Sequence, residues 1–250
     1  MAPAEIILVD DASNDGGATL SCLRRLVDQF SGMTEIPIRL IALQDNSGPS
    51  GARNSAWDIA IAEFVAFLDA DDAWHPKKIE IQYSWMQAHP EATLSGHRSD
   101  QINGLMPIQK LPLDGTWHVK KYGFRSMLFK NSLATRTVMM RRDTPFRFAD
   151  GKRYSEDYFL WLQLMASGER QIFIIGAVLA YSFKSSYGEN GLSGDLWCME
   201  CGELDNFYRL YKDKDIGWCM YLAVSAFSLL KYLKRVAIVA CRYNISLRLL

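Results

Sequence analysis

The stretch FVAFLDADD, residues 64–72, decides the fold class of this 250-residue chain, because an apolar run ends abruptly at a cluster of aspartates. Residues 64–68 have the composition of a buried strand, which is expected to end at Asp69. Residues 6–11, IILVDD, repeat this pattern, and residues 38–43, IRLIAL, form another apolar run. Segments with helical spacing lie between these runs. Apolar strands that alternate with helices predict an α/β protein, in which helices flank a sheet.

The rest of the chain continues this alternation. We expect helices over residues 20–30, 52–62, 77–88 and 155–165, strands over 171–181 and, at a sheet edge, over 135–140, and a helical tail after residue 202. Between Ser95 and Tyr122, prolines and polar residues favour an extended loop. The length suits one domain over residues 1–200 and a basic, aromatic tail over 201–250.

The sequence contains three acidic clusters. Two of them follow predicted strands directly, at the carboxyl ends where α/β sheets place ligand-binding groups, and the third lies at the start of a later helix. The three clusters are Asp10-Asp11, Asp69-Ala70-Asp71-Asp72 and Glu156-Asp157. Alternate residues of an extended segment point the same way, so Asp69 and Asp71 can face one hard cation. Mn²⁺ and Mg²⁺ favour oxygen ligands and leave positions for diphosphate oxygens and water. The same spacing also fits a turn followed by a helix cap, where aspartate is common.

Four motifs, in this order, resemble those of the family 2 glycosyltransferases. They are ILVDDASNDG (7–16) for V-D-D-x-S-x-D-G, NSGPSGARN (46–54) for N-x-G-x-x-x-A-R-N, FLDADD (67–72) for F-L-D-x-D-D, and SEDYFLW (155–161) for E-D-x-x-L-W. The resemblance implies a GT-A-type nucleotide-sugar-binding sheet. It also implies metal-dependent, inverting transfer from a nucleotide-sugar donor, expected to be a UDP-sugar, to a saccharide or lipid-linked saccharide. The expected metal is Mn²⁺ or Mg²⁺.

The resemblance also implies a role for each matching residue. By this resemblance, Asp11 would hydrogen-bond the nucleotide base, Asp10 would support the same turn, and Arg53 would contact the base or diphosphate. Asp69 would lie near the donor ribose or sugar, and Glu156 would bind substrate. Asp71 would coordinate the metal, and Asp157 would be the general base. An arginine suits a diphosphate because its planar fork pairs with phosphate oxygens. A general base takes the proton from the acceptor hydroxyl as that oxygen attacks the anomeric carbon.

Other interpretations remain open for several of these side chains. Arg53 also fits a surface position on a helix, and Glu156 and Asp157 also fit the favourable dipole at a helix start. Trp161 is expected to pack in the core. Trp74 and its neighbour His75 suit either the lining of the donor pocket or simple packing, and the remaining histidines show no metal-ligand spacing.

The chain departs from the family pattern at its start. Family members begin with an apolar strand that ends in a P-x-Y-N-like turn, whereas the first apolar strand here begins after Glu5 and matches the family's second strand. The family's first strand lies centrally in the sheet, between partners that both need hydrogen bonds. The alternatives are a rearranged sheet or a shortened product of a longer chain.

Bulk composition narrows the class of protein. Hydrophobic residues make up 49% and charged residues 22% of the chain, as in folded globular proteins, and the formal net charge is zero. This balance gives no sign of a nucleic-acid partner. Five cysteines, with one lone C-x-x-C at Cys198 and Cys201, match neither a disulfide framework nor a zinc site, so we expect a reducing compartment.

The tail bears on location. From Trp218 onward, apolar and aromatic residues are interspersed with lysines and arginines, and no acidic residue follows Asp215. Such a segment can lie peripherally on an anionic membrane or can pack on the catalytic domain. No signal peptide or membrane-spanning stretch is visible. We expect a cytoplasmic protein, with the inner face of the membrane as one location.

Two functions of different classes remain. The first is the metal-dependent glycosyltransferase, and the second is a catalytically silent binding protein that has lost its first strand. An aspartyl phosphatase is disfavoured because Ala73 stands where that chemistry expects a hydroxyl residue. A P-loop NTPase is disfavoured because no glycine-rich loop ends in Lys-Ser or Lys-Thr.

Overall fold

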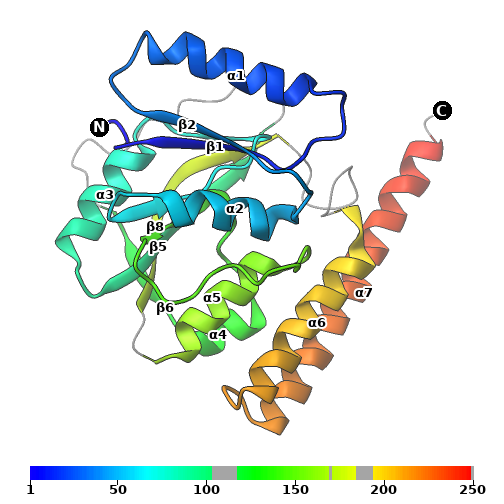
Figure 1. The fold of residues 1–250 in the computed structure, drawn as a ribbon. Coiled ribbons are helices and arrows are strands. Elements are labelled where there is room, and N and C mark those ends of the chain that lie inside the picture. The colour runs from blue at the N-terminus through cyan, green and yellow to red at the C-terminus, as the bar shows by residue number, and fades with distance from the viewer. Residues whose placement is uncertain (103–116, 169–170, 184–193, 249–250) are drawn as a thin grey trace.

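The computed structural model describes residues 1–102, 117–168, 171–183 and 194–248, and it forms a mixed α/β fold with helices on both sides of the sheets (Figure 1). In chain order the elements are β1 Ile6–Asp10, α1 Ala18–Ser31, β2 Ile38–Ala42, α2 Gly48–Ile59, β3 Phe64–Ala66, β4 Asp72–Trp74, α3 Lys78–Ala88, β5 Ala92–Gln101, β6 Val119–Tyr122, α4 Phe124–Phe129, the 3-10 helix η1 Thr135–Thr137, β7 Met139–Arg141, α5 Glu156–Ala166, β8 Gln171–Ser182, α6 Leu196–Lys212 and α7 Trp218–Arg248. The predicted α/β class with a central sheet and flanking helices is confirmed.

The strands form two separate sheets. β1 and β2 pair in parallel, with Ile6 opposite Ile38 and Asp10 opposite Ala42. The six-stranded sheet has the order β3-β7-β5-β8-β4, and β6 pairs with the same edge of β8 as β4 does. Its longest ladder is the parallel pairing of β5 with β8. Within the described residues β1 pairs with β2 alone and β3 with β7 alone, so the sheet is divided at the place where the family pattern has its first strand.

The core belongs to the larger sheet and α5. Leu160, Trp161 and Leu164 of α5 are fully buried, and Trp57 of α2 packs edge-to-face against Phe148 in the same cluster. The expected core position of Trp161 is confirmed. The strand expected over residues 6–9 is present, but its apolar side chains are only half-buried or exposed, and Ile6 is 36% exposed.

The tail is helical, as predicted, and packs on the rest of the molecule. Helices α6 and α7 form an antiparallel pair along one side (Figure 1). Phe207 and Val224 join the main core, and Lys231 and Arg235 of α7 pair with glutamates of α6. The division of the chain at residue 200 stays a prediction.

Two predictions of local structure were wrong. The loop expected from Ser95 to Tyr122 contains most of β5 and the whole of β6, because the polar run from residue 95 to 101 is held by its ladder to β8; residues 103–116 of that predicted loop lie outside the described part of the chain. The edge strand expected over 135–140 is instead η1 followed by β7, and β7 lies inside the sheet between β3 and β5.

Candidate functional site

Asp10 and Asp11, at the end of β1, hold the loop after β1 and the start of α2 by hydrogen bonds. Asp11 accepts hydrogen bonds from the Ser47 backbone N–H and hydroxyl at 2.8 and 2.9 Å and from the Gly48 N–H at 2.8 Å. These donors stand at the start of α2, whose own N-cap side chain makes no capping hydrogen bond. Asp10 is buried and accepts from the backbone and hydroxyl of Ser13. Both carboxylates therefore shape the loop after β1, and Asp11 also caps α2.

Arg53, one turn and a half into α2, joins two of the acidic clusters. Its Nη2 lies 2.8 Å from Asp69 Oδ1 and its Nη1 lies 2.7 Å from Glu156 Oε1. The guanidinium also lies over the Phe148 ring, 5.3 Å from its centroid. Burial lowers the pKa of Arg53, but the two carboxylates outweigh that effect and raise the pKa above its ordinary value. Arg53 is therefore a largely buried, fixed cation and not a surface residue.

The third cluster opens α5. Ser155, the residue before the helix, has a left-handed backbone conformation with φ of 57°, which is uncommon for residues other than glycine. Burial and then the neighbouring Asp157 raise the pKa of Glu156 to about 7, against the opposing effect of Arg53. Burial also raises the pKa of Asp157, and Arg53 opposes it. Two adjacent carboxyl groups with raised pKa values beside one cation are typical of a site that handles protons.

The carboxylate of Asp157 is held from two directions. Oδ1 accepts from the backbone N–H of Tyr158 at 2.6 Å, and Oδ2 accepts from the Thr135 hydroxyl at 3.0 Å. Thr135 belongs to η1 and was absent from the residues predicted from the sequence. No local pattern marks it, because the residues around it resemble a strand.

The Asp69–Asp72 segment is a turn, and the expected extended conformation was wrong. The Asp72 N–H donates to the Asp69 carbonyl at 3.1 Å, which places Ala70 and Asp71 at the two central positions. The same-face placement that an extended segment would give to Asp69 and Asp71 therefore does not apply here. Asp72 pairs with Arg136 at 3.1 Å.

The donor atoms of this turn still fit a hard divalent cation. Carboxylate oxygens are the ligands that Mn²⁺ and Mg²⁺ prefer, and the side chain of Asp69 is 43% exposed. In the described part of the chain no group of three or more acidic, histidine or cysteine side chains is arranged to hold a metal ion. A cation at this turn would therefore take its remaining ligands from a bound diphosphate and water.

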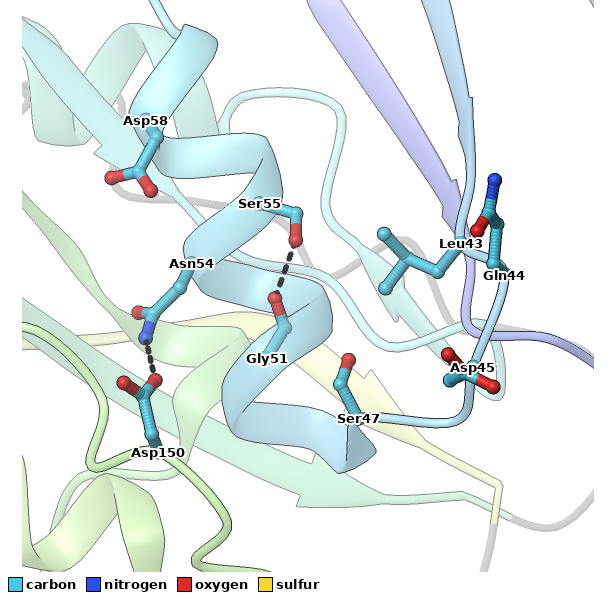
Figure 2. Close-up of a pocket in the computed structure, with 9 residues that line it drawn as sticks. All are labelled: Leu43, Gln44, Asp45, Ser47, Gly51, Asn54, Ser55, Asp58 and Asp150. Atoms are coloured by element: carbon cyan, nitrogen blue, oxygen red, sulfur yellow. Dashed lines mark hydrogen bonds between the residues drawn. The ribbon is translucent and has the colours of Figure 1, made fainter.

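A surface hollow of about 410 Å³ lies beside α2 (Figure 2). Asp45, Asp58 and Asp150 line it, together with polar side chains of α2, whereas Arg53, Asp69, Glu156 and Asp157 do not. Arg147 pairs with Asp58 at 3.4 Å, but Asp45 and Asp150 leave the lining with an excess of negative charge, which disfavours a diphosphate. The hollow is therefore a poor candidate for a site that binds an anion such as a diphosphate.

Comparison with known proteins gives consistent matches. The family model described as Glycosyl transferase family 2 matches residues 2–147. The chain is 32% identical over 167 residues to the putative teichuronic acid biosynthesis glycosyltransferase TuaG of Bacillus subtilis, covering 66% of this chain and 61% of that protein. It is 29% identical over 161 residues to the Escherichia coli UDP-Glc:alpha-D-GlcNAc-diphosphoundecaprenol beta-1,3-glucosyltransferase WfgD, covering 64% and 58%. The chain thus spans about three fifths of the length of these curated relatives.

Solved structures agree on the fold. A Pyrobaculum calidifontis mannosyltransferase, in complex with GDP-Man and Mn²⁺, superposes with a TM-score of 0.60 at 16% identity, over 96% of this chain and 67% of that one. Residues 1–349 of S. aureus TarS give a TM-score of 0.58 at 18% identity, over 90% and 61%. At such identities these likenesses establish the GT-A fold alone.

Proposed function

Because the chain belongs to glycosyl transferase family 2, we propose that it transfers a sugar from a nucleotide-sugar donor to a saccharide or lipid-linked saccharide acceptor, with inversion at the anomeric carbon. The observation that carries the proposal is the double ion pair of Arg53 with Asp69 and Glu156. It brings residues of three separate motifs to one place, directly beside Asp157. In this proposal the donor is a UDP-sugar, as the name of the Escherichia coli relative states for that protein.

The proposed division of labour follows from the contacts. Arg53 orients the donor diphosphate or base while Asp69 and Glu156 hold its guanidinium. Asp10 and Asp11 shape the loop that faces the nucleotide base. Asp157 accepts the proton of the acceptor hydroxyl, a task that suits a carboxylate whose pKa is raised above its ordinary value by burial.

The proposed metal is Mn²⁺ or Mg²⁺ with Asp71 as its protein ligand. Bound there, the cation would neutralise the charge that develops on the departing nucleoside diphosphate. The solved Pyrobaculum calidifontis structure, which has this fold, contains Mn²⁺, and this supports the same choice of cation class. Asp69 stands two residues away in the same turn and faces Arg53, so we propose that it lies near the donor ribose or sugar.

We also propose peripheral membrane contact through α7. Its exposed side chains include Leu222, Phe227, Leu230, Leu233 and Val236. None of the helices among the described residues is long and apolar enough to cross a bilayer. An apolar helix face suits a surface position in a lipid headgroup layer, next to a lipid-linked acceptor at the cytoplasmic side. Co-sedimentation with anionic vesicles, lost on Leu230→Glu with Leu233→Glu, would support this contact.

The test of the main proposal is Mn²⁺-dependent release of nucleoside diphosphate from a panel of UDP-, GDP- and dTDP-sugars. Release from one donor identifies it. Asp71→Ala should abolish the Mn²⁺-dependent release, with Asp143→Ala as a control at an exposed acidic position. Metal-dependent release that survives Asp71→Ala would contradict the assignment of the ligand.

A silent binding protein is the second candidate, and the divided sheet favours it. Among the described residues no strand lies between β1 and β3, where the family pattern has one. Metal-dependent nucleotide binding without any sugar release, with or without acceptor, would support this candidate over the enzyme.

A further inference from the structure

The 3-10 helix η1 contacts both acidic segments of the site. The Thr135 hydroxyl donates to Asp157 Oδ2 at 3.0 Å, and the next residue, Arg136, places Nη1 3.1 Å from Asp72 Oδ2. Thr135 is buried, at 7% exposed, whereas Asp157 is half-buried. Two consecutive side chains thus connect the start of α5 with the end of the Asp69–Asp72 turn.

Buried donors fix η1 in place. The carbonyl oxygens of residues 136–138 accept hydrogen bonds from Trp74 Nε1 at 2.7 Å, Gln82 Nε2 at 3.0 Å and Lys78 Nζ at 3.3 Å. Gln82 and Lys78 are fully buried, and the Lys78 ammonium lies 3.8 Å from the centre of the Trp74 ring. All three donors belong to β4 and α3, which directly follow the Asp69–Asp72 turn. Because buried donors are costly to leave unpaired, η1 cannot move relative to that turn without loss of stability.

Asp157 needs such an external support. Its Oδ1 is held by the N–H of Tyr158, the next residue of the same helix, and this contact alone leaves the carboxylate free to rotate about its own bond. The Thr135 hydroxyl adds a donor from a different element and so fixes the plane of the carboxylate.

We propose that Thr135 is a positioning residue: its hydroxyl orients the Asp157 carboxylate toward the acceptor hydroxyl and, through η1, keeps it in register with the Asp69–Asp72 turn. This inference rests on the proposed function, in which Asp157 is the general base. A base displaced by a fraction of an ångström loses much of its effectiveness, which gives this hydrogen bond a role in the rate.

The hydrogen bond also affects protonation. The charged groups that face Asp157 are Glu156 on its own helix, Arg53 on α2 and Asp69 after β3. Burial raises the pKa of Asp157, and the Thr135 hydroxyl, which donates to the ionised form, lowers it. Removal of that hydroxyl should therefore move the acidic limb of the kcat profile to higher pH.

The experiment compares Thr135→Val, which keeps the side-chain shape, with Thr135→Ser, which keeps the hydroxyl. The matched control is Thr137→Val, because the Thr137 hydroxyl lies in the same short helix but donates to the Ala134 carbonyl at 2.7 Å. For Thr135→Val we expect kcat to fall about 10- to 100-fold, the effect of one hydrogen bond to a charged group, with little change in donor KM. Thr135→Ser should restore most of kcat and the pH profile.

The outcomes separate this inference from the proposed function. Unchanged kcat and pH profile in Thr135→Val, while Asp157→Asn is inactive, would overturn the positioning role alone. Substantial activity in Asp157→Asn would overturn the base assignment and with it this inference. Equal losses in Thr135→Val and Thr137→Val would show a merely structural role. If Thr135→Val does not fold, as judged by thermal unfolding, the comparison of Thr135→Ser with Thr135→Ala decides in the same way.

Discussion

Asp10-Asp11 and Glu156-Asp157 are alike in sequence, since each is a pair of adjacent acidic residues. They differ in the hydrogen-bond donors and charged groups that the folded protein places around them. Asp11 is half-buried and receives three hydrogen bonds from the start of α2. Glu156 and Asp157 lie at the buried start of α5 and share the charge of Arg53. The first pair organises a loop, whereas the second pair has raised pKa values and can exchange protons.

The difference shows that the surroundings of an acidic pair, and not its sequence, decide its chemistry. Donors from a helix start stabilise the ionised form, while burial with too few cations destabilises it. Each of the following experiments tests whether Asp10-Asp11 and Glu156-Asp157 differ in function in this way.

The largest effect is expected for Asp157→Asn. Without a general base, kcat should fall by about 10²- to 10⁴-fold, while donor affinity stays close to that of the unmodified protein. Steady-state kinetics and calorimetric titration with the donor measure the two quantities. Asp143→Asn, at an exposed acidic position, is the control. A loss of donor affinity that accounts for the whole loss of activity would assign Asp157 to binding instead.

The second effect concerns stability against pH. The pKa of Glu156 is raised from 4.5 to about 7, so the folded state binds more protons than the unfolded state between these values. Stability should therefore fall as pH rises through this window, by at most about 3 kcal/mol, and level off above it. Urea unfolding at pH 4.5, 6 and 7.5 measures the slope. In Glu156→Gln the slope should flatten, and an unchanged slope would show that Glu156 is not the titrating group.

The smallest effect is expected for Asp11→Ala. Loss of the cap on α2 should lower the free energy of unfolding by about 1 kcal/mol and, because α2 carries Arg53, weaken donor binding as well. Asp15→Ala is the matched control, since Asp15 binds the N–H groups at the start of α1, away from Arg53. Denaturation and donor titration on both variants test this. Equal effects on donor affinity would remove the distinction between the two caps.

Much of the fold could be predicted because apolar strands and helical spacing are local signals. The strands around Leu8, Leu40 and Val65 and the helix that contains Trp161 appear close to their expected places. The clusters around Asp69 and Glu156 were identified from motifs, and the structure joins them through Arg53.

The failures share a physical reason, which is tertiary stabilisation. Residues 135–140 look like one strand, but η1 forms because distant donors such as Trp74 Nε1 bind its carbonyl groups. The polar residues from Ser95 onward look like a loop, but the ladder to β8 holds them in a strand. The turn at Asp69 likewise ends at a long-range contact, the ion pair of Asp72 with Arg136. Local sequence contains none of these contacts.

The divided sheet has a consequence for how the molecule opens. α1 has no buried residue, and within β1 and β2 only Asp10 is buried, whereas Leu94 and Ile172 at the centre of the larger sheet are fully buried. A segment with few buried apolar contacts can unfold locally at a small free-energy cost while the rest stays folded. Amide hydrogens of residues 6–42 should therefore exchange with deuterium faster than those of β5 and β8. A bound nucleotide, which would bridge the loop after β1 and Arg53, should slow the exchange of residues 6–42 more than that of β5 and β8.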